Sequence, residues 1–279
     1  MKSNRKAPIG QNFLTESSAA EEIVNALGDV SGSRVVEIGP GTGVLTDILA
    51  ARARQVIAIE LDRSLAAGLR FKYDGHPNVE IVEGDVLKVD FRELLGTTEA
   101  LPTHILGNLP YYITTDILLR IFQVHELFDQ IVIMVQREVA DRIAAHPGTR
   151  DYGLLSVTAQ LYTRAQKLFT LPPDAFSPPP KVHSAVVRMK VAPRFQELGV
   201  TAGEFIDFLK LAFGMKRKTL MNNLKRAYPE DHVRAALEVV GVRADVRAEA
   251  VGLEESAGIF RRLAKDDFTA KDAKGAKEK

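Results

Sequence analysis

The sequence predicts a mixed α/β fold, with a parallel sheet in its first two thirds and a small α-helical domain after it. Short β-branched runs alternate with amphipathic stretches, a pattern typical of a sheet with helices on both faces. After Pro193 the alternation stops and only helical patterns follow. We therefore expect a first domain over residues 1–195, a helical domain over 196–266 and a disordered tail over 267–279.

Individual elements follow from the same patterns. Five β-branched runs predict strands at residues 34–38, 55–60, 79–83, 103–106 and 130–135. Helix candidates of the first domain lie at 44–53, 63–73, 114–123 and 137–145. Two further apolar stretches, 166–171 and 183–191, flank a proline-rich segment and favour a closing antiparallel hairpin. The second domain is expected to contain helices at 203–213, 216–227, 230–240 and 254–264.

Composition narrows the classes of protein. With 279 residues, 46% hydrophobic and 26% charged, the chain has the composition of a globular protein. It contains no cysteine, which excludes disulfides, thiolate nucleophiles and Cys-ligated zinc and fits a reducing compartment. No apolar stretch near the N-terminus is long enough for a signal peptide or a membrane span. We expect a cytoplasmic protein without a membrane partner, and the six histidines show no spacing for a metal.

Charge is distributed unevenly along the chain. The formal net charge is +1, yet residues 177–228 hold ten Lys or Arg against three Asp or Glu. Five of these cations are close together, at Lys216, Arg217, Lys218, Lys225 and Arg226, where we expect them along one helix. Like charges so close together repel unless solvent or phosphates surround them. The segment is therefore a candidate RNA-binding surface, with a merely solubilising surface as the alternative.

A glycine-rich turn is predicted between the first strand and its helix. Residues 37–43 read EIGPGTG, and Gly39 and Gly41 would let a ligand approach the backbone closely. The spacing is not the G-x-G-x-x-G of a dinucleotide site, and no Gly-Lys-Ser/Thr of a P-loop is present. Taken alone, the segment could also be a tight strand-to-helix turn without a ligand.

Carboxylates follow the next two predicted strands. Glu60 ends the second strand, where it can accept hydrogen bonds from the ribose hydroxyls of a nucleoside, with Asp62 as a nearby competitor. Asp85 follows the third strand and is placed to accept from an adenine amino group. Three consecutive strand ends with glycines, then Glu, then Asp fit S-adenosylmethionine better than a nicotinamide cofactor.

Residues 108–111 (NLPY) follow the fourth strand and are expected to face the same cleft. An exocyclic base amine is a poor nucleophile, so an enzyme that methylates it must hold the nitrogen with acceptors and clamp the ring. The side-chain oxygen of Asn108 and the carbonyl of Leu109 are the candidate acceptors, Pro110 fixes the turn, and Tyr111 stacks on the base. The alternative is a proline-stiffened turn with a packed tyrosine.

In this order and spacing, the motifs resemble those of the ribosomal RNA adenine dimethyltransferase family over nearly the whole chain. Residues 11–14 (QNFL) match an N-terminal cofactor motif, and 176–186 match a late motif with the pattern F-x-P-x-P-K-V-x-S-A-V. The resemblance implies a Rossmann-like class I S-adenosylmethionine-dependent methyltransferase sheet. It implies cofactor contacts by Gln11, Asn12, Leu14, Gly39, Gly41, Glu60, Asp85, Val86 and Asn108.

The resemblance also implies a substrate. The catalytic set becomes Asn108, Leu109, Pro110, Tyr111 and Phe176, with the target adenine between Tyr111 and Phe176. Lys181 and Asn222 join the RNA-binding candidates. The expected activity is N6,N6-dimethylation of adjacent adenines in a loop near the 3′ end of small-subunit (16S) ribosomal RNA, by a monomer. Alternatives are a large-subunit methyltransferase of the antibiotic-resistance type and an RNA-docking assembly factor whose catalysis is secondary.

Overall fold

A computed structural model describes the backbone of residues 12–96 and 101–275, and side chains as far as residue 264. Two compact units are present: unit 1 is Met1–Ala140 with Gln166–Val191, and unit 2 is Asp141–Ala165 with Ala192–Lys279. This differs from the boundary expected at residue 195, because residues 141–165 belong with the C-terminal segment. The physical reason is helix α7 (Leu154–Tyr162), whose apolar side chains are buried and which packs on two helices of unit 2, α9 (Ala202–Ala212) and α12 (Leu253–Gly275).

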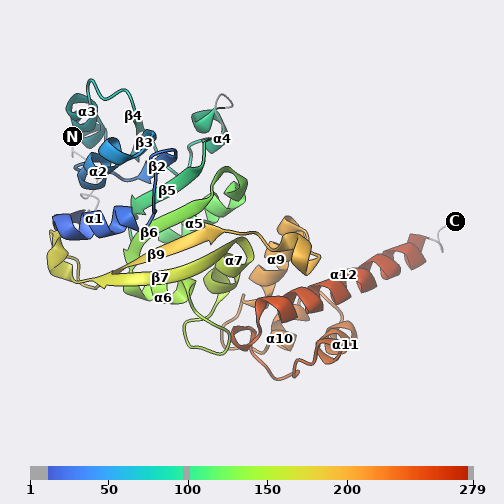
Figure 1. The fold of residues 1–279 in the computed structure, drawn as a ribbon. Coiled ribbons are helices and arrows are strands. Elements are labelled where there is room, and N and C mark those ends of the chain that lie inside the picture. The colour runs from blue at the N-terminus through green and yellow to red at the C-terminus, as the bar shows by residue number, and fades with distance from the viewer. Residues whose placement is uncertain (1–11, 97–100, 276–279) are drawn as a thin grey trace, which may run out of the picture. The chain divides into compact units, whose positions relative to one another are not determined.

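A seven-stranded sheet, in the order β4-β3-β2-β5-β6-β9-β7, forms the centre of unit 1 (Figure 1). Its parallel strands are β2 (Arg34–Ile38), β3 (Gln55–Glu60), β4 (Val79–Glu83), β5 (Thr103–Asn108) and β6 (Gln130–Gln136). Strand β9 (Ser184–Val191) runs antiparallel to β6, and β7 (Thr163–Leu171) lies beside β9. The five predicted strands and the two closing strands are thus confirmed, to within a few residues at their ends.

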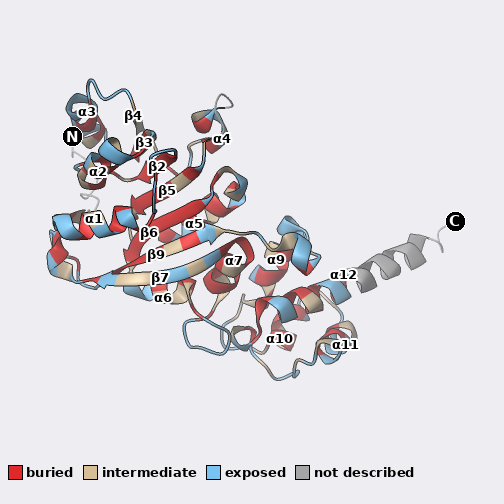
Figure 2. Cartoon of the chain, viewed as in Figure 1, coloured by how far each residue is buried: buried red, intermediate tan, exposed pale blue. Residues whose placement is uncertain are grey.

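Helices cover both faces of this sheet. The helices of unit 1 are α1 (Ser17–Asn25), α2 (Val44–Arg52), α3 (Arg63–Lys72), α4 (Phe91–Leu95) and α5 (Thr114–Gln123), with a 3₁₀ turn at His125–Leu127. Helix α6 (Arg137–Ile143) follows β6. Ile23 of α1 and Leu49 of α2 pack with Val35, Leu106 and Val132 of the strands in one buried core. In Figure 2 the central strands β5 and β6 are coloured largely as buried. The connections through α4 and α5 run along the sheet in the opposite direction from those through α2 and α3. Because such connections are right-handed, α4 and α5 lie on the opposite face of the sheet from α2 and α3.

The order of the strands reverses between β2 and β5. Chain progression leads from β2 outward to β3 and β4, and then returns to β5 on the other side of β2. Ile38 of β2 pairs with Gly107 of β5, and a Cβ added at Gly107 would lie 2.7 Å from the Ile38 carbonyl oxygen. Only glycine permits this close approach, which brings the ends of β2 and β5 together. Ligands of such sheets bind at this reversal point.

A second, two-stranded sheet joins the N-terminal segment to the proline-rich segment. Strand β1 (Phe13–Leu14) pairs antiparallel with β8 (Phe176–Ser177), with Leu14 opposite Phe176. A 3₁₀ turn at Pro173–Ala175 precedes β8, and Thr15 donates from its backbone nitrogen to the Ala175 carbonyl at 2.9 Å. This pairing of residues so distant in sequence was not among the sequence predictions.

Unit 2 is helical. Besides α7, α9 and α12 it contains α8 (Phe195–Leu198), α10 (Leu220–Leu224), α11 (Glu230–Val240) and a 3₁₀ turn at Ala248–Ala250. Helix α11 has the predicted bounds, because acidic residues open it and Gly241, at a φ of 78°, ends it. The backbone of α12 is helical to Gly275, which differs from the disordered tail expected from residue 267, since Ala and Lys favour continuation of an anchored helix. Residues 276–279 lie outside the described part of the chain.

Candidate cofactor and substrate site

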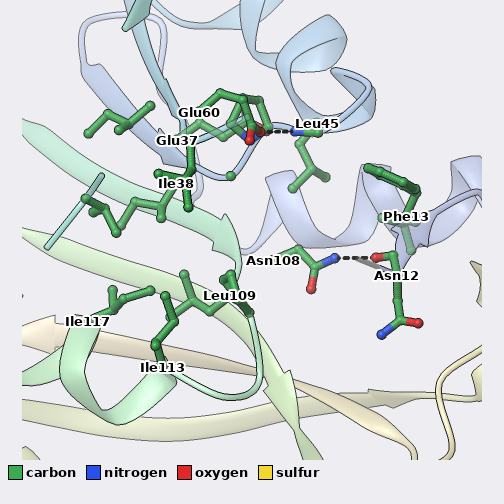
Figure 3. A pocket seen from close by; sticks show the side chains of 18 of the residues that line it. Asn12, Phe13, Glu37, Ile38, Leu45, Glu60, Asn108, Leu109, Ile113 and Ile117 are labelled. Carbon is green, nitrogen blue, oxygen red and sulfur yellow. Dashed lines mark hydrogen bonds between the residues drawn. The ribbon is translucent and has the colours of Figure 1, made fainter. Parts of the chain in front are cut away.

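A cavity lies in unit 1 at the carboxyl ends of β2, β3, β4 and β5. It is lined by the glycine turn after β2, by Glu60 and Leu61, by residues 84–86, and by residues 108–113, which we call the NLPY turn. Asn12, Phe13 and Leu14 line it from the N-terminal segment. Figure 3 shows Phe13, Glu60 and Asn108 around one space. The apolar side chains of Leu109, Ile113 and Ile117 lie together on one side of it. Four predicted strand-end motifs therefore meet in one place.

Glu60 holds the glycine turn. Its Oε2 accepts from the backbone nitrogen of Gly41 at 3.0 Å, and its Oε1 accepts from that of Asp62 at 2.9 Å. The side chain is 2% exposed. A carboxylate offers about four acceptor positions, so both oxygens keep capacity for a ligand hydroxyl. Asp62, the competitor for this role, instead caps α3 by accepting from Ser64 and Leu65.

Glu37 is a second buried carboxyl at this site, and sequence reasoning gave it no separate role. Its Oε2 accepts a hydrogen bond of 2.6 Å from the hydroxyl of Thr46 in α2. Burial raises the pKa of Glu37 to about 7, while the Thr46 hydrogen bond lowers it and the nearby charge of Glu60 raises it further. Glu37 is the first residue of the glycine-rich motif in the sequence, but no sequence pattern indicated that its side chain is buried.

The segment after β4 carries Asp85 and Val86 to the cavity wall. Asp85 accepts through Oδ1 from the backbone nitrogen of Leu87 at 3.0 Å, and its backbone carbonyl accepts from Lys88 and Val89. Lys88 lies 3.7 Å from the other carboxylate oxygen. In addition, Arg120 of α5 donates to the Val89 carbonyl at 3.1 Å, so the segment is fixed at both ends.

Asn108 and Leu109 line the cavity and carry two acceptor oxygens. The Nδ2 of Asn108 donates to the backbone carbonyl of Asn12 at 3.0 Å, which fixes the orientation of the amide (Figure 3). Leu109 is anchored by its own backbone nitrogen, which donates to the Met134 carbonyl at 3.0 Å. Within the part of the chain that the structure describes, no hydrogen bond occupies the Asn108 Oδ1 or the Leu109 carbonyl oxygen. Both oxygens are therefore open to a donor.

The two tyrosines of the NLPY turn differ in their surroundings. The hydroxyl of Tyr111 shares a hydrogen bond of 2.7 Å with the hydroxyl of the buried Ser184, and burial raises the pKa of Tyr111. Tyr112 also lines the cavity but is 65% exposed. Sequence reasoning singled out Tyr111 and missed its partner Ser184.

Phe176 is not brought to the cavity. It is 3% exposed and packs in the core with Leu14, Leu171 and Ala175, as part of the β1–β8 pairing. In this structure apolar neighbours cover the ring, and the sandwich of a base between Tyr111 and Phe176 stays a prediction. An aromatic residue that does line the cavity is Phe13, whose ring would lie 3.0 Å from a Cβ added at Gly41. Gln11, the other expected contact from this segment, lies outside the described residues.

The RNA-binding candidates of unit 2 lie on a turn and not along one helix. Residues 213–219 form turns and bends, and α10 begins only at Leu220, where the Thr219 hydroxyl accepts from the Asn222 backbone. We call residues 213–219 the basic turn, because Lys216, Arg217 and Lys218 are exposed on it. The predicted helix over 216–227 is thus wrong: its threonine cap delays the start, and Lys225 and Arg226 follow its end.

The buried side chain of Asn223 stabilises the basic turn through hydrogen bonds. It is 1% exposed, and its Nδ2 donates to the carbonyls of Ala212 and Met215 at 2.7 and 3.4 Å, at the end of α9. Its neighbour Asn222, the predicted RNA contact, is half-buried. Lys181, the remaining candidate, is exposed in unit 1 after β8.

The chemistry of the cavity fits S-adenosylmethionine. A buried carboxylate with spare acceptor capacity suits ribose hydroxyls, Asp85 suits an adenine amino group, and apolar side chains such as Ile38 line the space between. Glycine at position 41, with a φ of 60°, leaves the room that a Cβ would fill. This fold and site define a class I methyltransferase that uses S-adenosyl-L-methionine.

Comparison with known proteins identifies the family. The sequence model described as "Ribosomal RNA adenine dimethylase" matches residues 2–265, and the chain belongs to that family. A relative from Koribacter versatilis, named "Ribosomal RNA small subunit methyltransferase A", is 55% identical over 94% of this chain and 95% of its own. A relative of the same name from Alkaliphilus metalliredigens is 38% identical over 92% and 91%.

Solved structures agree with this assignment. A dimethyladenosine transferase from Plasmodium falciparum superposes with a TM-score of 0.76 at 25% identity, covering 91% of this chain and 98% of the other. The 23S rRNA methyltransferase ErmE superposes with a TM-score of 0.67 at 29% identity, covering 91% and 100%. Similarity to both therefore extends through the two units.

Neither a metal site nor a membrane-spanning helix is found among the described residues. No group of three or more His, Cys, Asp or Glu side chains among them is arranged to hold a metal ion. In the same part of the chain, no helix has the length and apolar character needed to cross a membrane.

Proposed function

We propose that this enzyme dimethylates the N6 amino groups of two adjacent adenines in a loop near the 3′ end of small-subunit (16S) ribosomal RNA, during assembly of that subunit. The observation that carries the proposal is the pair of open acceptors, the Asn108 Oδ1 and the Leu109 carbonyl, on a turn with a fixed amide. The choice of small-subunit RNA is supported by the relatives named for that subunit, which reach 55% identity, against 29% for the 23S enzyme.

In the proposed reaction, two acceptors hold the target amine. Each N–H of an exocyclic amine can donate to one of them, which draws the nitrogen lone pair out of conjugation with the ring. S-adenosylmethionine supplies a methyl group activated by its sulfonium. No general base is required of the protein, because the amine loses its proton during or after transfer, and the work of Asn108 and Leu109 is orientation and charge stabilisation.

The other site residues are assigned to binding. Tyr111 stacks on the target adenine, and Pro110 keeps the turn in shape. On the cofactor side, Glu60 accepts from ribose hydroxyls and Asp85 from the adenine amino group, while Gly39, Gly41 and Val86 form the walls. Asn12 and Leu14 close the cavity from the N-terminal segment, and their places in its lining support this assignment.

The proposal includes how the RNA is held. A base must leave its stack to reach the cavity, which costs a few kcal/mol and least for a loop nucleotide. The basic turn, with Lys181, Asn222, Lys225 and Arg226, is proposed to contact phosphates. We further propose that the enzyme acts as a monomer, and a ribosomal substrate supports a cytoplasmic location.

Radiolabelled methyl transfer tests the proposal. Small subunits lacking this methylation, naked 16S RNA and large subunits are each incubated with the enzyme and S-adenosylmethionine labelled in its methyl group. Label is expected in dimethyladenosine from small subunits. Incorporation into large subunits instead would support the resistance-type alternative. No incorporation, with retained binding to small subunits, would support an assembly factor.

A further inference from the structure

The NLPY turn displays two consecutive tyrosines from a rigid backbone. Ile113 donates from its backbone nitrogen to the Pro110 carbonyl at 3.2 Å, and the Thr114 hydroxyl donates to the same carbonyl at 3.0 Å. Tyr111 and Tyr112 occupy the two central positions of the turn that these bonds close. Because these bonds fix the backbone of the turn, they also fix the positions from which the two side chains start.

Within the described residues, the two tyrosines differ in their contacts with the rest of the protein. Tyr111 is tied to the buried Ser184, whereas Tyr112 is 65% exposed although it lines the cavity. No hydrogen bond to the Tyr112 hydroxyl is present within the described residues. An aromatic ring that is 65% exposed gains little stability from burial, and its place in the cavity lining leaves it available to a ligand.

Extrusion of a target base creates a requirement that Tyr112 can meet. When one adenine leaves the stack, the base beside it loses a stacking partner on one face. Proteins that bind unstacked RNA cover such faces with aromatic rings. Phe176, the other expected aromatic residue, is buried in the core and does not supply that cover.

We propose that Tyr112 is a second base-contacting residue, which stacks on the nucleotide beside the target while Tyr111 contacts the target adenine. This inference rests on the proposed function, in which the target has an adenine neighbour. A purine neighbour offers the larger ring for stacking. Tyr112 would then help to select RNA in which two adenines are adjacent, and its contribution would appear in binding of RNA and not of cofactor.

Steady-state methyl transfer to undermethylated small subunits tests the role of Tyr112. Tyr112→Ala is expected to raise KM for the subunit about tenfold, the order of effect of losing one stacked base, with KM for S-adenosylmethionine unchanged. Tyr112→Phe should keep wild-type KM, because stacking needs the ring and not the hydroxyl. The matched control is Phe71→Ala, which removes an 88% exposed ring on α3, away from the cavity lining, and should change neither KM.

A changed substrate separates stacking from other effects. Subunits are assembled with 16S RNA in which one of the two adenines is uridine, leaving one target beside a small pyrimidine. The wild type should bind these subunits less tightly than unaltered subunits. Tyr112→Ala should weaken binding little further, because the uridine has already removed the stacking contact of Tyr112. The inference would be overturned if the uridine substitution and Tyr112→Ala weakened binding independently, so that their effects added. It would also be overturned if Tyr112→Ala kept the wild-type KM for the subunit, or if it raised the KM for S-adenosylmethionine in parallel. Failure of the wild type on unaltered subunits would instead contradict the proposed function.

Discussion

The hydroxyl of Tyr111 lies 2.7 Å from the hydroxyl of Ser184, and this contact joins the NLPY turn to the strand that closes the sheet. Ser184 is the first residue of β9 and is fully buried, opposite Gln136 at the end of β6. One tyrosine ring is therefore fixed by a strand that lies far from it in the sequence. The geometry of the NLPY turn therefore depends on correct pairing of β9.

Tyr111→Phe should separate the hydroxyl from the ring. We expect loss of about 1 kcal/mol of unfolding free energy, because one hydrogen bond is removed and Ser184 is left without its partner. Methyl transfer should stay within a few-fold of wild type, whereas Tyr111→Ala should lower kcat/KM by roughly 10- to 100-fold as stacking is lost. Chemical denaturation and radiolabelled transfer measure the two effects; equal kinetic loss in both variants would mean that the hydroxyl itself contacts substrate.

Asn108→Ala should abolish methyl transfer and leave RNA binding largely intact, since the variant removes one of the two acceptors for the amine. Asn108→Asp is the sharper variant. A carboxylate places an oxygen against the Asn12 carbonyl, where the amide now donates at 3.0 Å, so the side chain should rotate and lose activity despite keeping an acceptor. Transfer assays and filter binding to small subunits distinguish these outcomes. Equal loss of binding and transfer would contradict the assignment.

Glu37→Gln should change how stability depends on pH. The pKa of Glu37 is raised to about 7 in the folded protein from an ordinary value of 4.5, so its contribution is full below about 4.5 and is lost as pH rises through about 7. Relative to the glutamine variant, the wild type should lose on the order of 3 kcal/mol over that window. Denaturation of both proteins without ligand, from pH 4 to pH 8, measures the difference. A constant difference would show that Glu37 does not titrate there.

Phe176→Leu distinguishes a core role from a base-contacting one. Since the ring packs with Leu14, Leu171 and Ala175, the variant should lose about 1.5 kcal/mol or less of stability and keep KM for small subunits. Phe176→Ala should cost roughly 3–5 kcal/mol through the cavity it leaves. Thermal unfolding and KM are measured on the same samples. A raised KM for RNA in Phe176→Leu, without loss of stability, would support the predicted sandwich of a base between Tyr111 and Phe176.

Neutralising the basic turn should weaken RNA binding in a salt-dependent way. Lys216, Arg217 and Lys218 form no ion pair with an acid in the described part of the chain, so all three are available to phosphates. Their replacement by glutamine should reduce the slope of log affinity against log salt by about 2. KM for S-adenosylmethionine should not change.

A matched triple variant of unit 2 serves as the control. Lys210, Arg234 and Arg243 are exposed like the cations of the basic turn, but each is paired with an acid, at 2.9, 3.0 and 2.6 Å. Their replacement by glutamine removes the same formal charge. If both triple variants changed the salt slope equally, binding would depend on net charge and not on the turn.

The sequence was sufficient for the parallel sheet and for the meeting of its strand-end motifs. Strands β2 to β6 are short runs rich in β-branched residues, and their parallel order places the residues after each strand at one edge of the sheet. Gly39, Glu60, Asp85 and Asn108 could therefore be assigned to one cavity in advance. Their common lining of the cavity is confirmed, and their individual roles remain predictions.

What the sequence could not provide depends on contacts between distant segments. Phe176 pairs with Leu14, and Tyr111 binds Ser184, over separations for which no local pattern exists. Exposure of an aromatic side chain is equally a tertiary property, so Phe176 and Tyr112 could not be distinguished. The late start of α10 has a local signal in Thr219, a favourable N-cap residue, whereas the good helix formers at residues 215–218 favour an earlier start.

The division of unit 2 into two separated stretches of sequence has a consequence for synthesis of the chain. Helix α7 has seven buried residues among its nine, and it is translated well before α9 and α12, on which it packs. On the nascent polypeptide, the apolar surface of α7 therefore stays exposed to solvent while the closing strands β7 and β9 are synthesised. Chains that end near residue 195 would never cover it, so shortened forms of this enzyme should be found in aggregates or bound to chaperones.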